Sequence, residues 1–321
     1  MNYNHMKYSS IILNNEIWLV EARIRYDLEW FDKIIIAESN TTFSGLQKPF
    51  FFEKYQYLFK EFKDRIIYKK ITDLPKPIAG EYIGTMNRPS NENRWICEHA
   101  MRDRLKEAIL SISDDQDIIC FQDSDEIVSH EFLESLELEN IQDSIIKTRH
   151  YDFRQTLLQP HKPTSTHGFI TAAKNLKLID AHDYSPVLTY KRGAYFAHHI
   201  VSPGVLRHKD GTSIYKEYKL PIQNIIHQSN ENLGWHLSDM YGGKELKELT
   251  DIQKIKGNVF AHSEYEDKNF DLSPPYFEQK TEKIIDWALN KPIDKSIKLA
   301  PNAPEFIFDS IFFNIFCGLN R

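Results

Sequence analysis

The stretch Ile118–Ile127, IICFQDSDEI, decides the fold class that we expect. Its first four residues are apolar, which is typical of a strand that is buried on both faces of a sheet. A second run rich in β-branched residues, Phe31–Ala37, ends at the polar residues Glu38, Ser39 and Asn40. Open α/β sheets bind their ligands beyond the ends of such strands. The sequence therefore predicts an α/β protein whose ligand site follows these two strands.

Apolar residues recur at helical spacing in two segments, about 91–110 and 276–290. The second segment follows the Pro274-Pro275 break, where a helix can begin. In the first segment, Arg94, Glu98 and Arg102 form a charged stripe on a separate side. This stripe is either a set of exposed ion pairs or a face turned toward a ligand.

The composition is that of a globular protein, with 41% apolar and 27% charged residues among 321. A formal net charge of −6 argues against a protein that binds the nucleic acid backbone. Three cysteines are too few for a disulfide framework or a four-thiolate zinc site, which favours a reducing compartment. We find no leader peptide and no run of about 18 apolar residues. These observations predict a cytoplasmic protein.

The rear of the chain is less regular in sequence. From Ile145 onward we expect shorter strands joined by long loops. The aromatic-rich segment 306–316 is interrupted by Asp309 and Asn314. It either docks on the domain or makes a peripheral contact with a membrane surface or a partner.

The strongest local signal for chemistry is the pair Asp123 and Asp125 at the end of the apolar strand. Two carboxylates separated by one residue suit a hard divalent cation that keeps coordination positions for a substrate's phosphates. Such a cation neutralises the charge that builds on a diphosphate leaving group. A solvated turn is the alternative. Glu126 adds a third acid, so we expect a cation or a basic side chain to offset the cluster.

A second group of candidates lies between residues 234 and 265. Trp235, His236 and Asp239 occupy a glycine-flanked segment that suits a sugar site, because an indole face stacks on sugar C–H groups. The alternative is that the tryptophan anchors this segment to the core and the histidine is hydrogen-bonded. His262 is a candidate metal ligand and Glu264 a candidate base, or both are structural.

Several separated motifs occur in a fixed order from residue 14 to about 265. They are Asn14-Asn15-Glu16 with Glu21 and Arg23, Glu38-Ser39-Asn40-x-Thr42-Phe43-x-Gly45 with Lys48-Pro49, Trp95 with Arg102, Asp123-Ser124-Asp125-Glu126-Ile127, Gly234-Trp235-His236-x-Ser238, and His262-Ser263-Glu264-Tyr265. Together they resemble glycosyltransferase family 17, the family of β-1,4-mannosyl-glycoprotein 4-β-N-acetylglucosaminyltransferase. No phosphate-cradling glycine loop, nucleophile elbow or zincin helix is present in the sequence.

The resemblance implies a GT-A type fold, with a Rossmann-like nucleotide-sugar-binding domain around a mixed central sheet. On this reading the chain is one catalytic domain, 1–321. About 1–145 would bind the nucleotide sugar and the metal, and about 146–275 would bind the acceptor. Residues 276–321 would form a C-terminal helix and the apolar tail.

The resemblance also implies roles for the residues of the motifs. Asp123 and Asp125 would hold Mn²⁺ or Mg²⁺ and, through it, the diphosphate of UDP-GlcNAc. Glu38, Ser39 and Asn40 would receive the nucleotide. Arg102 would approach the donor diphosphate or brace the acidic residues.

The implied reaction is inverting: a hydroxyl of a glycan acceptor attacks the anomeric carbon from the face opposite the leaving UDP. Such an attack needs a general base, for which Asp239, Glu264 and Glu126 are the candidates. Two other functions fit the motifs. One is a haloacid-dehalogenase-like phosphohydrolase with Asp123 as nucleophile, and the other is a non-catalytic carbohydrate-binding protein.

Overall fold

The computed structural model describes most of the first half of the chain and shorter parts of the second. The described residues are 5–42, 47–75, 78–83, 89–93, 95–137, 141–142, 144–154, 157–158, 162–177, 206–207, 213–214, 224–226, 234–238, 274–293 and 296–317.

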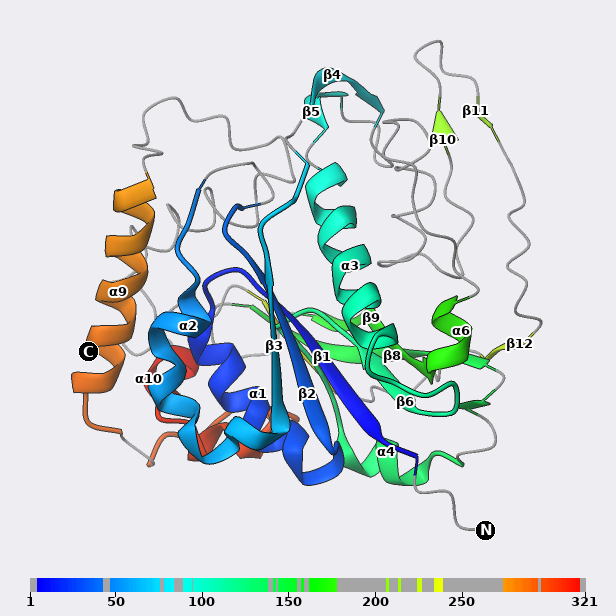
Figure 1. The fold of residues 1–321 in the computed structure, drawn as a ribbon. Coiled ribbons are helices and arrows are strands. Elements are labelled where there is room, and N and C mark those ends of the chain that lie inside the picture. Colours follow the sequence, from blue (N-terminus) through cyan, green and yellow to red (C-terminus); the bar gives the residue numbers. More distant parts are fainter. Residues whose placement is uncertain are drawn as a thin grey trace.

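A mixed sheet of nine strands forms the centre of the molecule (Figure 1). Its order is β3-β2-β1-β6-β9-β8-β13-β7, and β12 pairs with β8 outside this path. The strands are β1 (Lys7–Leu13), β2 (Lys33–Ser39), β3 (Ile66–Ile71), β6 (Ile118–Phe121), β7 (Glu126–Val128), β8 (Ser144–Arg154), β9 (Lys162–Ala172), β12 (Asn224–Ile226) and β13 (Gly234–Ser238). β3, β2, β1 and β6 are parallel to one another, whereas β9 is antiparallel to both β6 and β8. The expected α/β class with a mixed central sheet is confirmed.

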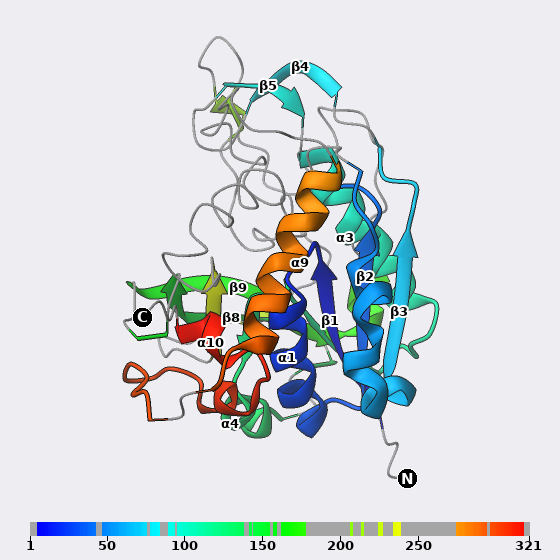
Figure 2. The same cartoon turned by 90° about the vertical axis from the view of Figure 1, so that its left-hand side faces the viewer.

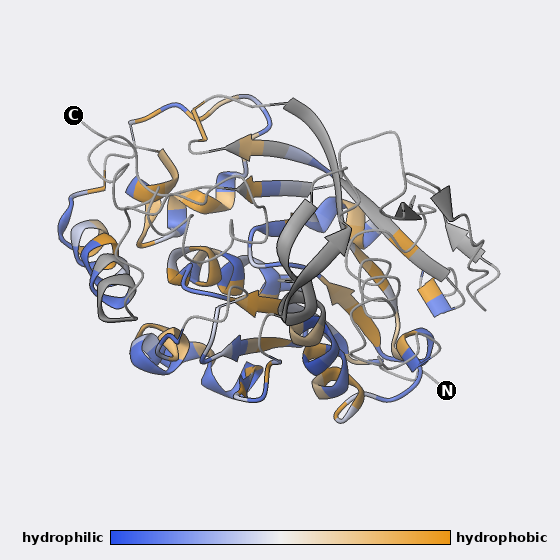
Figure 3. Ribbon diagram, turned by 90° about the horizontal axis from the view of Figure 1, so that it is seen from above, coloured by the Kyte–Doolittle hydropathy of each residue, from blue (hydrophilic) through white to orange (hydrophobic). Residues whose placement is uncertain are grey.

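Helices cover both faces of the parallel part of the sheet. They are α1 (Ile17–Trp30), α2 (Phe51–Tyr55), η1 (Gln56–Arg65), α3 (Trp95–Leu110), α4 (His130–Ser135), α6 (Ala173–Lys177), α9 (Pro274–Asn290), η4 (Glu305–Asp309) and α10 (Phe313–Cys317). Two short hairpins stand apart from the sheet, β4 (Ile78–Ile83) with β5 (Pro89–Asn93) and β10 (Leu206–Arg207) with β11 (Ser213–Ile214). Figure 3 shows hydrophobic strand segments running between these helices.

The alternation of side chains along each strand sets which helix covers which face. In β2, Ile34 and Ile36 pack in the core cluster that contains α1, whereas Ile35 and Ala37 pack in the cluster that contains α3. Because both faces are buried, the strand reads as a continuous apolar run in the sequence. This is why the sequence predicted β2 and β6 correctly.

Two expectations about the chain beyond β6 are tested by the fold. The helix predicted for 276–290 is confirmed as α9. The expectation of shorter strands from Ile145 onward is wrong at its start, because β8 and β9 have 11 residues each and pair with one another. Their sequences are rich in polar residues, so no apolar run marked them.

The C-terminal tail packs into the core cluster around α1. Phe312, Phe313, Ile315 and Phe316 are fully buried in this cluster. The Ser310 hydroxyl donates to the Glu21 carboxylate across 2.6 Å. The tail therefore docks on the domain, whereas Phe306, Phe308 and Ile311 are only partly buried. Within the described part of the chain, no helix combines the length and the apolar run that crossing a bilayer requires.

Candidate functional site

The ends of β1 and β6 form the topological switch point of the sheet. From β1 the chain builds β2 and β3 on one side, and it then places β6 on the other side of β1. The region beyond two such strand ends, which we call the crevice, is where open α/β sheets bind ligands. Figure 2 shows β1, β2 and β3 pointing toward the side of the molecule where the β4–β5 hairpin lies.

The loop that follows β6, which we call the acidic loop (Gln122–Glu126), is held by hydrogen bonds at both ends. The Glu126 carboxylate accepts the amide of Asp123 across 2.9 Å, and Glu126 is 2% exposed. The backbone carbonyl of Asp125 accepts the amide of Leu237 in β13 across 2.7 Å. Asp123 and Asp125 keep about a quarter of their side chains exposed, 28% and 25%. Glu126 therefore closes the turn, and the two aspartates are the acids that solvent reaches.

Each exposed aspartate is met by a basic side chain from another element. Nη2 of Arg102, which α3 contributes, lies 2.6 Å from Oδ2 of Asp123. Nε2 of His236 in β13 lies 3.3 Å from Oδ2 of Asp125. Arg102 thus braces the acidic loop, which is one of the two roles expected for it. His236, which was expected at a sugar site, lies beside the acidic loop.

The residues at the acidic loop fit a divalent cation in part. A carboxylate oxygen of Asp125 and an imidazole nitrogen of His236 converge, and both are ligands that Mn²⁺ accepts. Cations that carry phosphate groups are often held by only one or two protein ligands, because the phosphates and water complete the shell. Among the described residues no group of three acids, histidines or cysteines is arranged to hold a metal. A cation here would depend on ligands from a bound diphosphate.

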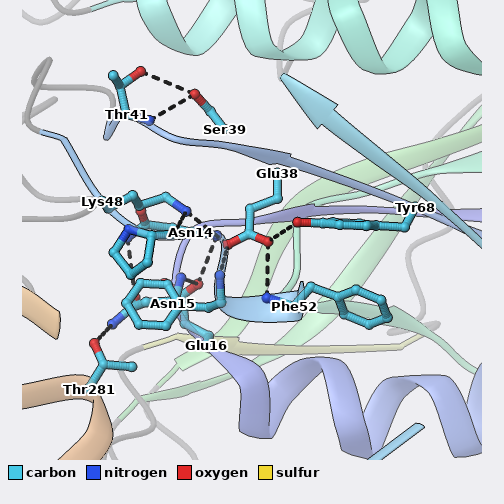
Figure 4. Close-up of polar contacts among 12 residues, drawn as sticks. Asn14, Asn15, Glu16, Glu38, Ser39, Thr41, Lys48, Phe52, Tyr68 and Thr281 are labelled. Carbon is cyan, nitrogen blue, oxygen red and sulfur yellow. Dashed lines mark hydrogen bonds and ion pairs between the residues drawn. The ribbon is translucent and has the colours of Figure 1, made fainter. Parts of the chain in front are cut away.

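The residues that follow β1 form hydrogen bonds at the end of this strand (Figure 4). The Glu16 carboxylate accepts the amides of Asn14 and Asn15 across 3.3 Å and 3.0 Å. Burial raises the pKa of Glu16, the amide hydrogen bonds lower it, and the charge of Asp125 raises it further. β1 and β6 pair in parallel, so their carboxyl ends lie at the same edge of the sheet. Nδ2 of Asn15 donates to the Thr281 hydroxyl across 3.2 Å, which ties α9 to this point.

Glu38 has a different environment from the one that its sequence position suggested (Figure 4). Its carboxylate is fully buried and accepts four hydrogen bonds. The donors are Lys48 Nζ at 3.0 Å, the amides of Phe51 at 2.6 Å and Phe52 at 3.0 Å, and the Tyr68 hydroxyl at 2.7 Å. Burial lowers the pKa of Lys48, and the Glu38 charge acts against this shift. In this structure Glu38 anchors the segment 48–52 and has no capacity left for a nucleotide.

Ser39 and Asn40 continue from Glu38 at the end of β2. The Ser39 hydroxyl accepts the amide of Thr41 across 3.0 Å and contacts its hydroxyl at 3.1 Å. The Asn40 amide donates to Ile71 O, and its carbonyl accepts from Lys48 N. Oδ1 of Asn40 is buried without a hydrogen-bond partner. Of the three residues expected to receive the nucleotide, Asn40 thus keeps an unused acceptor.

The comparison with known families agrees with this geometry. The sequence model of Glycosyltransferase family 17 matches residues 2–161, about half of the chain. The chain belongs to glycosyltransferase family 17. The matched part contains β1, β2, α3 and the whole acidic loop, so the switch-point crevice lies inside it. A search of curated proteins finds no match to the chain.

Membership in family 17 makes the chain a glycosyltransferase. This favours the transferase expectation over the phosphohydrolase and the non-catalytic carbohydrate-binding alternatives. Trp235 and His236 lie outside the matched part, which ends at residue 161. The predicted residues Asp239, His262 and Glu264 lie outside both the matched part and the described residues.

Trp235 of this family 17 transferase has the contacts of an anchor. Its Nε1 donates to the carbonyl of Asn302 across 2.8 Å. Its ring meets Tyr26 and Phe306 edge-on, with centroids 6.0 Å and 5.7 Å apart. These contacts bind β13 to α1 and to the C-terminal segment. They correspond to the anchoring alternative, and the sugar-stacking role has no support from them.

Sequence reasoning named one further residue of the candidate site within a motif but gave it no role. Arg23 in α1 is fully buried and donates to the backbone carbonyl of Asp123. Its partners in the sequence gave a weak signal, since Ser9 and Ser10 interrupt the otherwise apolar strand β1. Polar residues inside a buried strand need partners, and Arg23 donates to the Ser9 hydroxyl and to the backbone carbonyl of Ser10.

Proposed function

We propose that the chain is a metal-dependent inverting glycosyltransferase that transfers a sugar, GlcNAc from UDP-GlcNAc, to a hydroxyl of a glycan acceptor. The observation that carries this proposal is the position of Asp123 and Asp125. They follow β6 at the switch point of the sheet, inside the part of the chain that matches a glycosyltransferase family. Two solvent-accessible carboxylates at this point suit a cation that carries the donor diphosphate.

The roles of the residues follow from their contacts. Asp125 and His236 would hold Mn²⁺ or Mg²⁺, which when bound neutralises the charge that develops on the UDP leaving group. Asp123 is paired with Arg102, so the arginine keeps the like charges of the loop from repelling one another. Ser39 and Asn40 stand at the nucleotide side of the crevice, at the end of the neighbouring strand β2.

Inversion requires a base on the acceptor side. The base takes the proton of the acceptor hydroxyl, the hydroxyl oxygen forms a bond to the anomeric carbon, and the bond to the UDP oxygen breaks. Asp239 and Glu264 are the candidates for this base. Glu126 is the weakest of the three, because it is buried and accepts the amide of Asp123.

A donor screen tests the proposal. The protein is incubated with UDP- and GDP-sugars and Mn²⁺, with and without glycan acceptors, and the release of nucleoside diphosphate is measured. We expect UDP-GlcNAc to exceed the other donors, and we expect EDTA to abolish the signal. Silence across the panel, or release that EDTA leaves unchanged, would contradict the proposal.

A further inference from the structure

A fully buried arginine connects α1 with the acidic loop. Arg23 is 0% exposed and lies on the side of α1 that faces the sheet. Its guanidinium reaches past β1 to the residues that follow β6. The sequence separation of about 100 residues between Arg23 and the loop shows that tertiary folding creates this contact.

Arg23 forms hydrogen bonds with two sets of partners, one in α1 and β1 and the other in the acidic loop. In the first set, Nε donates to Asp27 Oδ2 at 3.0 Å, and Nη2 lies 3.0 Å from Ser9 Oγ and 2.9 Å from Ser10 O. On the loop side, Nη1 donates to the carbonyl of Asp123, and Nη2 lies 3.0 Å from Gln122 Oε1. The guanidinium therefore binds helix, strand and loop at once.

The serine hydroxyls of β1 extend this network to β6. Ser10 Oγ donates to the Cys120 carbonyl at 3.1 Å and accepts the Gln122 amide at 3.3 Å. Ser9 Oγ donates to Asp27 Oδ2 at 2.5 Å. Gly168 of β9 packs closely against Gln122, since a Cβ atom at Gly168 would lie 2.7 Å from Gln122 Cγ. The start of the acidic loop is thus packed as well as hydrogen-bonded.

Stability alone does not explain a network of this kind. Arg23 and Asp27 form a buried ion pair, with side chains 0% and 3% exposed. Apolar replacements of buried ion pairs are often as stable as the pair, because removing two charges from water is costly. What apolar side chains cannot supply is five directed N–H groups in a rigid plane. The particular property of Arg23 is therefore the geometry that it imposes on its acceptors.

Arginine side chains contact both the backbone carbonyl and the carboxylate of Asp123. Arg23 holds its backbone carbonyl, and Arg102 holds its carboxylate at 2.6 Å. The orientation of the whole residue is fixed by these two contacts together with the Glu126 carboxylate on its amide. Asp125 follows two residues later in the same loop, where the amide of Leu237 also holds its backbone carbonyl.

We infer that Arg23 is a positioning residue for the donor site: it fixes the acidic loop so that the carboxylates of Asp123 and Asp125 face the crevice. This inference rests on the proposed function of the loop. Arg23 is fully buried and contacts the loop through Asp123 and Gln122, so it would act through the loop. Residues that orient metal-binding groups in this indirect way affect metal affinity or activity by about 10- to 100-fold.

The test compares Arg23→Lys with Arg65→Lys. Lysine keeps the charge at position 23 and loses the planar fork. Arg65 is a matched control, because it also donates to backbone carbonyls, those of Leu28 and Asp32 at 2.8 Å and 3.0 Å, and it does not contact the acidic loop. Binding of Mn²⁺ in the presence of UDP is measured by the loss of the free-ion signal in electron paramagnetic resonance. Amide hydrogen exchange is followed in peptides that cover residues 120–128.

We expect Arg23→Lys to weaken Mn²⁺ binding by about 10- to 100-fold and to speed exchange in the acidic loop, whereas Arg65→Lys changes neither. A folded Arg23→Lys protein with unchanged Mn²⁺ binding and unchanged loop exchange would overturn the inference. If Arg23→Lys does not fold, Gln122→Met decides, because it removes one loop acceptor and keeps Arg23. Faster loop exchange in that variant supports the inference, and wild-type exchange overturns it. A wild-type protein that binds neither Mn²⁺ nor UDP would instead overturn the proposed function.

Discussion

Glu38 gives the sharpest stability prediction, because a single carboxylate accepts four hydrogen bonds in the core. Glu38→Gln keeps the size of the side chain and removes its charge. The amide has one acceptor oxygen, and its NH₂ group faces donors that it cannot satisfy. The buried ammonium of Lys48 also loses its partner, whose Oε1 lies 3.0 Å away.

The magnitude follows from two routes. Removing one partner of a buried ion pair costs about 3–5 kcal/mol. Losing about two hydrogen bonds to a charged acceptor, at about 1.5–3 kcal/mol each, gives a similar range. Domains are stable by about 5–15 kcal/mol in total, so the variant folds with a much lower free energy of unfolding. Glu53→Gln is the control, because Glu53 pairs with Lys70 at the surface, where both side chains are about half exposed.

Urea unfolding followed by far-ultraviolet circular dichroism measures both variants. We expect a loss of about 3–5 kcal/mol for Glu38→Gln and below about 1 kcal/mol for Glu53→Gln. Equal, small losses in the two variants would refute the assignment of Glu38 as the anchor of segment 48–52. The earlier interpretation, in which Glu38 receives the nucleotide, would then be the better one.

Three further predictions follow from other contacts. Burial and the charge of Glu38 raise the pKa of Tyr68 above its ordinary 10.0. The unfolded chain therefore loses the phenol proton at a lower pH than the folded chain, and the free energy of unfolding falls as the pH rises above 10. Tyr68→Phe should lessen that fall in urea titrations. Trp235→Ala should lower the free energy of unfolding by about 2–3 kcal/mol, somewhat less than for a fully buried ring, and should leave the KM of the acceptor unchanged at a temperature where it is folded; a selective rise in this KM would restore the sugar-stacking role. Phe316→Ala should cost about 3–5 kcal/mol, measured by the same unfolding assay, whereas a membrane-binding tail would tolerate the change.

Local signals explain what the sequence predicted about the fold. β6 was marked by an apolar run of four residues and α9 by a proline break followed by helical spacing. β8 and β9 gave no such signal, because a strand pair that is long and polar is specified by its partner, which single-sequence patterns do not contain. The segment 11–26 mixes apolar residues with charged ones such as Glu16, Glu21 and Arg23, so its pattern marks neither the end of β1 nor most of α1, both of which it contains.

The location of the candidate site could be predicted for those residues whose position after a strand alone determines where they lie. Asp123 and Asp125 follow a buried strand, and topology brings them to the crevice whatever their side chains contact. Glu38 does not lie beyond the end of its strand as the sequence predicted, because β2 runs to Ser39, two residues beyond the predicted end at Ala37. Alternation then places Glu38 on the same face as Ile34 and Ile36, which α1 covers.

The role of Arg23 could not be predicted from the sequence for a different reason. Its partners in the acidic loop are about 100 residues away in the chain. The sequence shows an arginine and an aspartate four residues apart, which reads equally well as an exposed helical ion pair. Only the fold shows that this pair is buried beneath the loop.

Calorimetric titration of UDP-GlcNAc tests the central claim, that the acidic loop binds a nucleotide sugar through a cation. Wild-type protein is compared with Asp125→Asn and with Asp115→Asn, an exposed acid whose partner is Lys177 and which lies outside the loop. We predict that the wild type and Asp115→Asn bind UDP-GlcNAc with Mn²⁺ and not with EDTA, and that Asp125→Asn binds at least about 10-fold more weakly. Equal binding by all three proteins, or binding that EDTA leaves unchanged, would contradict the account.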